Sequence, residues 1–400
     1  LFSVTFRINE GKKVKIENII ITGNEVTRKG IILRELLVKE SDYALYESIR
    51  ETKRRLERLG VFTEVKIEEI LISPDKENLL INLREGERNY ASLGMGMETM
   101  NEPRSFAVWN NAIRPRGTAE YIRSNIFGST AQVSVVGQIS MKERRGVISW
   151  EQPYFLGFPL QTFLNGWWER EERKSYTFER QGLSFSTIKS LSEKENMIFV
   201  GTLRMARTTL LELYISESEV DRQHFPFSAT SVSGSFIWER RDDPFNPVKG
   251  HFLSTALEWA YPVFNAESDY LRVFSKYQHY VSLFPSITLS STVRLGLGKG
   301  RMPIHERFFG GGSNSFRGVE FDELGPKDPN FFSPVGGKAL LLFNFELAFP
   351  FLTRFENLLA SVFFDKGNVY SKRRQVSWSS LQDAVGFGLR YRTPLGPVRF

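Results

Sequence analysis

Residues 338–350 read Lys-Ala-Leu-Leu-Leu-Phe-Asn-Phe-Glu-Leu-Ala-Phe-Pro, and this stretch contains the pattern that decides the fold. In its centre every second residue is apolar, and polar residues stand between them. The apolar face carries Leu341, Phe343, Phe345 and Leu347. Successive side chains of a strand point to opposite faces, so the pattern predicts a strand with one apolar face and one polar face.

The same alternation recurs from residue 89 to the end of the chain, in about 14 runs of roughly 10–14 residues separated by turn residues. Charged residues such as Glu258 and Arg294 fall on the polar side of their strands. We therefore expect an antiparallel transmembrane β-barrel over residues 89–400, with lipid outside and a polar lumen. A soluble β-sandwich or propeller could alternate in a similar way. Proline after an aromatic strand end, as at Phe349-Pro350, favours the barrel, because aromatic girdles mark the membrane interfaces.

Composition is compatible with this reading and excludes several kinds of site. The mean hydropathy is −0.27, and no apolar run approaches the length of about 18 residues that predicts a transmembrane helix. The chain has no cysteine, which excludes disulfides and thiolate metal sites, and only 4 histidines in 400 residues, so we expect no metal site and no cofactor. The net charge of +7 is spread along the chain, so we expect no nucleic-acid partner.

The first 88 residues follow a different pattern, which predicts a small α+β domain over residues 12–88. A strand over residues 14–22 is followed by a helix for which Thr27 is the expected N-cap. A second helix is predicted over residues 45–59, and two strands follow over 62–72 and 78–83. The predicted order is β-α-α-β-β. Residues 1–11 repeat the strand ending seen near residues 81–86, which predicts the tail of a preceding domain of the same kind.

A glycine-rich loop interrupts the series of strands and carries the candidate site. It runs from Arg307 to Pro326 and contains three consecutive glycines, Gly310, Gly311 and Gly312, followed by Phe316, Arg317 and Gly318. Glu346 and Asp365 lie on predicted strands at polar positions. If the loop folds inward, its guanidinium can form bidentate pairs with these two carboxylates. The alternative is a solvated loop arginine and two ordinary lumen acids.

These motifs together resemble outer-membrane protein assembly factors of the BamA/TamA type, the superfamily that joins POTRA domains to a barrel. Residues 12–88 resemble a POTRA domain, and the loop resembles the family's arginine-glycine motif in the sixth extracellular loop, with Phe316 where the family commonly has Val. The resemblance implies that Glu346 and Asp365 are the lumen partners of Arg317. It also implies a barrel of about 16 strands, so with about 14 complete here we expect the last strands to be missing and the chain to be C-terminally truncated.

The resemblance also implies a function without chemistry: insertion of β-barrel proteins into the bacterial outer membrane, with the POTRA domain in the periplasm. The expected partners are unfolded outer-membrane protein clients, the lipid bilayer and accessory lipoproteins. The first barrel strand would be a lateral gate, and Gly94 and Gly96 fit a weakened edge, although packing or curvature explains them equally. A secretion translocator that passes a partner protein across the membrane remains an alternative. An enzyme is not expected, because no Gly-x-Ser-x-Gly nucleophile motif occurs.

Overall fold

A computed structural model describes residues 13–98, 114–141, 143–192, 194–220, 226–263, 269–284, 286–351, 357–393 and 396–399. The chain divides into two compact units. The first contains residues 1–92 with 120–135 and 149–156, and the second contains the remainder. The predicted repeat at residues 1–11 lies outside the described residues, and the domain boundaries at 12 and 89 stay predictions.

The first unit contains a three-stranded sheet covered by two helices. Its elements are β1 (Lys15–Thr22), α1 (Lys29–Glu35), α2 (Tyr46–Arg58), β2 (Phe62–Ser73) and β3 (Lys76–Glu85). The strand order is β1-β3-β2, with β1 parallel and β2 antiparallel to β3. Ile32 and Leu56 from the helices pack with Leu79 and Ile81 of β3 in one apolar core. The predicted order β-α-α-β-β is therefore confirmed.

One prediction within this unit is wrong. Arg28, not Thr27, is the N-cap of α1, and the cap makes no side-chain hydrogen bond. The Thr27 hydroxyl instead accepts a hydrogen bond from Asn125 Nδ2 at 2.8 Å. The Glu85 carboxylate accepts the backbone N–H of Thr27 at 2.7 Å. The hydroxyl and N–H groups of Thr27, which a local cap would have used, thus form hydrogen bonds with residues distant in the sequence.

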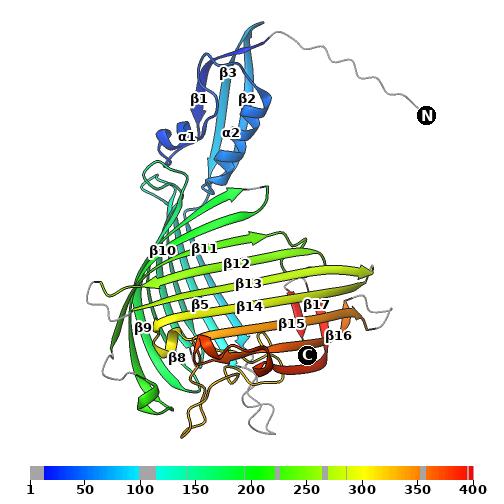
Figure 1. Ribbon diagram of the computed structural model, residues 1–400. Coiled ribbons are helices and arrows are strands. Elements are labelled where there is room, and N and C mark those ends of the chain that lie inside the picture. Colours follow the sequence, from blue (N-terminus) through cyan, green and yellow to red (C-terminus); the bar gives the residue numbers. More distant parts are fainter. Residues whose placement is uncertain are drawn as a thin grey trace, which may run out of the picture. The chain divides into compact units, whose positions relative to one another are not determined.

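The long sheet runs in strict sequence order from β4 at one edge to β18 at the other (Figure 1). Fourteen of its strands have nine or more residues, and β18 has four. They are β4 (Asn89–Glu98), β5 (Arg114–Ile126), β6 (Ala131–Ile139), β7 (Glu143–Gln152), β8 (Gln161–Glu172), β9 (Tyr176–Ser192), β10 (Met197–Leu213), β11 (Phe227–Glu239), β12 (Gly250–Ala260), β13 (Asp269–Phe284), β14 (Ile287–Arg301), β15 (Ala339–Pro350), β16 (Leu358–Tyr370), β17 (Gln382–Thr393) and β18 (Gly396–Arg399). Between residues 89 and 399, the described parts contain no pairing that joins β4 to β18, so the sheet is not closed.

Alternation along the strands sorts side chains between two faces, as predicted. On β16 Phe364 is 41% exposed, whereas its neighbour Asp365 is completely buried. On β15 Leu342 is buried against the loop that follows β14, and Phe345 is exposed on the other face. One face therefore presents a band of exposed apolar side chains, and the other holds polar groups and the 302–338 loop. No helix in the described part of the chain is long and apolar enough to span a bilayer.

Candidate functional site

The 302–338 loop lies against the polar face of the sheet and brings Arg317 to both predicted carboxylates. Arg317 Nε and Nη2 donate to the two oxygens of Asp365, at 2.8 and 2.6 Å. Arg317 Nη1 donates to Glu346 Oε2 at 2.5 Å, and the Arg317 backbone N–H donates to Asp365 Oδ2 at 2.9 Å. The Arg317 side chain is 18% exposed, and its guanidinium carbon lies 3.7 Å from the centre of the Phe363 ring. The arginine is thus held by a bidentate ion pair, a second ion pair and an aromatic face.

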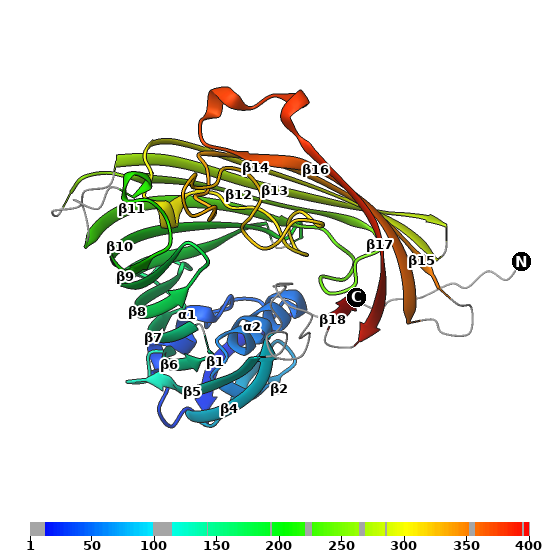
Figure 2. The same cartoon turned by 90° about the horizontal axis from the view of Figure 1, so that it is seen from below.

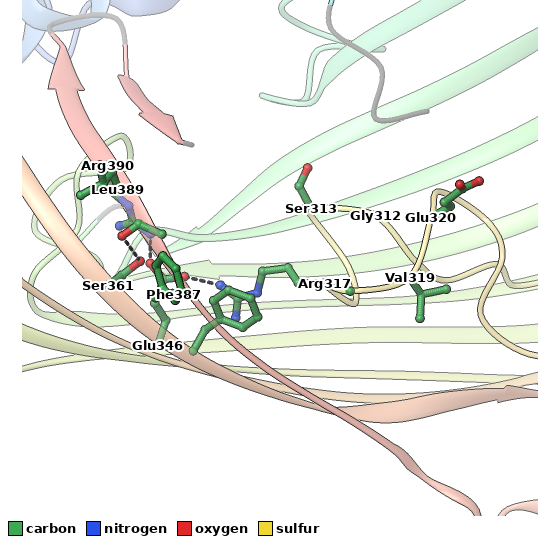
Figure 3. Close-up of a pocket in the computed structure, with 13 residues that line it drawn as sticks. Gly312, Ser313, Arg317, Val319, Glu320, Glu346, Ser361, Phe387, Leu389 and Arg390 are labelled. Atoms are coloured by element: carbon green, nitrogen blue, oxygen red, sulfur yellow. Dashed lines mark hydrogen bonds and ion pairs between the residues drawn. The ribbon is translucent and has the colours of Figure 1, made fainter. Parts of the chain in front are cut away.

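Further polar contacts fix the loop around Arg317 to β14 and β15, and Arg390 of β17 supports the clamp through Glu346. Arg390 of β17 donates to the second oxygen of Glu346. Asn344 Nδ2 of β15 donates to the backbone oxygen of Ser315 at 2.8 Å. Arg294 of β14 donates to the backbone oxygen of Asn314 at 2.8 Å. Figure 3 shows Glu346 between Arg317 and Arg390. A cavity of about 540 Å³ adjoins this arginine clamp, defined as Arg317, Glu346, Asp365 and Arg390.

The glycines and Phe316 give the loop the shape that the clamp requires. Gly311 has φ +115°, and a Cβ there would lie 2.1 Å from the backbone oxygen of Glu320. Gly312 and Gly318 also have positive φ, of +84° and +87°, which glycine adopts without strain. At Gly310 a Cβ would lie 3.1 Å from the Leu324 side chain. Phe316 is 1% exposed and packs in the apolar cluster beneath the loop, so the residue before Arg317 anchors the loop by burial.

A second polar cluster, not predicted from the sequence, holds the start of the same loop. Glu306 is 3% exposed and accepts from Arg204 at 2.9 Å and from Arg272 at 2.8 Å. The same two arginines contact Glu258 of β12, at 2.6 and 2.5 Å. Tyr270 donates its hydroxyl to Glu258 at 3.2 Å. We call Glu306, Arg204, Arg272 and Glu258 the second anchor. Of these residues, the sequence pattern singled out only Glu258, by its polar position on a predicted strand.

The predicted gate residues lie on an edge strand. β4 pairs with β5 on one side only within the described chain. A Cβ at Gly96 would meet nothing within 4 Å, and one at Gly94 would meet only Thr118, at 3.9 Å. Close packing among the described residues therefore does not require glycine at either position. Their part in gating stays a prediction.

The described ranges hold no group of three or more His, Asp or Glu side chains that could bind a metal ion. The two polar clusters pair cations with carboxylates: Asp365 contacts one guanidinium group, and Glu346, Glu258 and Glu306 each contact at least two. This arrangement stabilises a loop position. Such pairs give geometric specificity rather than large net stability, because desolvation offsets much of their attraction.

Comparison with known families identifies the architecture. The profile of the Omp85 superfamily domain matches residues 125–400. The chain belongs to the Omp85 superfamily. The POTRA profile, described as a surface antigen variable number repeat, matches residues 14–86. The predicted fold class, a POTRA domain followed by an antiparallel transmembrane sheet, is therefore confirmed.

The chain is also similar in sequence to curated proteins and in fold to solved structures. The outer membrane protein assembly factor BamA of Nitratidesulfovibrio vulgaris is 25% identical over 410 residues, which cover 100% of this chain and 50% of the relative. BamA of Neisseria meningitidis is 24% identical, over 98% of this chain and 54% of the relative. The chain thus spans about half the length of these relatives. The crystal structure of BamA from Haemophilus ducreyi lacking POTRA domains 1–3 superposes with a TM-score of 0.82 at 17% identity, over 98% of this chain and 81% of that one. CdiB from Acinetobacter baumannii gives a TM-score of 0.54 at 14% identity, over 96% of this chain and 68% of that one.

Membership of this superfamily gives the chain its place in the cell. It is an outer-membrane protein of the BamA type, with its POTRA domain in the periplasm. β4 therefore starts at the periplasmic side, and because the strands run in sequence order, β14 and β16 end at the outer side. The loop that carries Arg317 connects outer strand ends and folds back onto the polar face.

Proposed function

We propose that this protein assembles β-barrel proteins into the outer membrane without catalysing a chemical reaction. The observation that carries the proposal is the match of the whole chain, POTRA and sheet together, to relatives named as assembly factors. Unfolded outer-membrane proteins are the proposed clients. Accessory lipoproteins and other periplasmic proteins are proposed to bind through the POTRA domain.

The POTRA sheet offers an edge for a client segment. β2 is an edge strand, because the order of the sheet is β1-β3-β2. Near its end Ile70, Leu71 and Ile72 are 44, 64 and 51% exposed. An edge strand presents unpaired backbone groups to which an extended peptide can add, and apolar side chains beside it supply contact area. We propose that β2 is where a client strand first docks.

The second step of client assembly, after docking at β2, would take place at β4, the first strand of the long sheet. β4 is an edge whose glycines leave its pairing weak, since glycine inside a strand lowers stability. We propose that β4 opens laterally and templates a client strand, while the arginine clamp keeps the loop on the polar face. In this scheme Arg317, Glu346 and Asp365 are positioning residues, and no residue performs chemistry.

Reconstitution tests the assembly function directly. The full chain is placed in liposomes, a urea-denatured small outer-membrane barrel is added, and its folded fraction is followed by heat-modifiable gel mobility. We expect faster client folding than in empty liposomes, and slower folding with Arg317→Ala. Arg145→Ala serves as the matched control, because Arg145 is an exposed arginine on β7. Client folding no faster than in empty liposomes would overturn the proposal.

The alternative function is transport of one partner protein across the membrane, as in a secretion translocator. The two functions differ in the final location of the substrate protein. A translocator would deliver a protease-accessible soluble protein to the far side of the liposome, whereas an assembly factor leaves a membrane-embedded, heat-modifiable product. The same liposomes therefore distinguish the two.

A further inference from the structure

Six basic residues surround the outer ends of three neighbouring strands, far along the sheet from β4. They are Lys299, Arg301, Lys338, Lys372, Arg373 and Arg374, and we call them the outer basic cluster. In the sheet register Leu297 of β14 is opposite Ala339 of β15, which is opposite Tyr370 of β16. Neighbouring strands lie about 4.8 Å apart, so the three strand ends fall within roughly 10 Å.

Hydrogen bonds hold these strand ends together. The Lys338 backbone oxygen accepts from Gly298 at 2.7 Å, and its N–H donates to the Tyr370 oxygen at 2.9 Å. Its ammonium group donates to the Gly300 oxygen at 2.7 Å. Lys338 is therefore fixed between the β14 end, with Lys299 and Arg301, and the segment that begins at Lys372.

The described residues form no ion pair with the cluster, although Asp269 of β13 is opposite Arg301 in the sheet register. Among the residues that the structure describes, no carboxylate lies within 4.0 Å of any of the six cationic groups. Burial is the main cause that lowers the pKa of Lys338, and the positive charges of Arg307 and Lys372 lower it further. On the polar face of the sheet, by contrast, Arg204, Arg272 and Arg317 each contact two carboxylates. Uncompensated like charges this close repel one another unless an anion joins them.

Aromatic side chains place the cluster at the level of lipid headgroups. The segment after β16 folds along the outer side of the sheet, where the Trp378 ring lies 5.6 Å from the ring of Phe343 on β15. Figure 2 shows this orange-red segment on the side of the sheet away from the 302–338 loop. Trp378 remains 66% exposed. Exposed aromatic rings above an apolar band mark the interface between hydrocarbon and headgroups.

We propose that the outer basic cluster binds the phosphate groups of a phosphorylated glycolipid in the outer leaflet. Clusters of Lys and Arg at a membrane surface recognise phosphorylated headgroups, and guanidinium groups match phosphate oxygens in a bidentate way. The acyl chains would lie on the exposed apolar face of β14, β15 and β16, below Trp378. This binding site depends on the protein's place in the membrane and not on its proposed assembly function.

The test uses the full chain in nanodiscs of phosphatidylcholine, with bisphosphorylated lipid A as the probe. Retained lipid A is measured by native mass spectrometry, and an apparent affinity by titration. The variant Lys372→Gln/Arg373→Gln/Arg374→Gln removes three exposed charges that lie outside the strands of the sheet. Its matched control, Lys189→Gln/Lys194→Gln/Lys249→Gln, removes three exposed charges near the periplasmic strand ends. Heat-modifiable mobility checks that every variant folds.

We expect the outer variant to bind lipid A at least about tenfold more weakly than the wild type, the loss that one charge-assisted contact represents. The control should bind as the wild type does. Binding to the wild type should also weaken with added salt and with enzymatically dephosphorylated lipid A. Equal binding by the outer variant, or an equal loss in the control, would overturn the proposal. So would poly-glutamate that binds the cluster as strongly as lipid A does, since it would assign the site to an acidic protein.

Discussion

Replacing Arg317 by alanine tests how the loop is held. The substitution leaves Asp365, which is completely buried, without its bidentate partner, whereas Glu346 keeps Arg390. Removing one member of a buried ion pair costs roughly 3–5 kcal/mol, because the remaining charge is stranded away from water. The sheet itself keeps its backbone pairing, so this cost falls on the docked position of the loop. The population of detached loop should rise by roughly 10²-fold to several thousand-fold.

Hydrogen exchange measures that population directly. In the docked loop the Gly312 N–H donates to Val319 and the Leu324 N–H donates to Gly310, at 2.8 and 2.9 Å. These amides exchange only when the loop opens. In Arg317→Ala, a peptide covering residues 308–325 should lose most of its protection, while peptides from β12 and β13 should keep theirs. Heat-modifiable mobility establishes that the sheet still folds.

A double variant distinguishes the effect of the unpaired Asp365 charge from the effect of losing the Arg317 contacts. Adding Asp365→Asn to Arg317→Ala removes the uncompensated carboxylate, so part of the protection should return. Arg317→Lys keeps the charge and loses the bidentate geometry, so it should fall between wild type and alanine. Wild-type protection of residues 308–325 in Arg317→Ala would refute the reasoning, and so would a double variant less protected than the single one.

Three further predictions concern other parts of the same system. Glu306→Gln should loosen residues 302–308 in the same exchange experiment, because Arg204 and Arg272 then face each other with one carboxylate fewer; unchanged protection there would contradict the second anchor. Burial raises the pKa of Asp322, in the loop and outside the strands, to about 6 from an ordinary 3.8, so the docked loop takes up a proton that a detached loop does not. Loop protection should therefore increase as the pH falls from 6.5 to 4.5, and Asp322→Asn should flatten that profile; a profile of the opposite sign would exclude Asp322 as its cause. Gly96→Val has room for its side chain, so the sheet should fold normally, while client assembly in liposomes should slow because β4 pairs more firmly; unchanged assembly would remove the weak-edge argument.

The alternation of apolar and polar residues predicted most of the fold and part of the candidate site. Alternation depends on local sequence alone, so it predicted the strands and also the polar position of Glu346 and Asp365. Parity left a solvated loop arginine as the alternative, and the resemblance to the family singled out Glu346 and Asp365 as the partners of Arg317. The Thr27 cap failed for the opposite reason, since Asn125, 98 residues away in the chain, competes for the same hydroxyl.

The second anchor needed information that no single strand contains. Arg204 and Glu306 lie 102 residues apart, and their contact depends on the register of several strands and on the path of the loop. Each residue alone looks like an ordinary charge on a polar face. Glu258 and Arg272 are directly opposite in the register of β12 and β13, so a known register would have shown this pair first.

The arginine clamp and the second anchor hold the loop at two places that differ in their position along the sheet. The second anchor joins it to β10, β12 and β13, in the middle of the sheet, where each strand is paired on both sides. The arginine clamp includes Arg390 of β17, which follows β15 and β16 in the order of the sheet. A displacement of β17 would move Arg390 and its hydrogen bond to Glu346 without moving the strands of the second anchor, which lie further along the sheet. Arg317 has two carboxylate partners, so it can keep Asp365 while Glu346 follows Arg390. If β17 is displaced, we therefore expect the contact between Arg317 and Glu346 to be lost first, while the bidentate pair of Arg317 with Asp365 keeps the loop on the polar face.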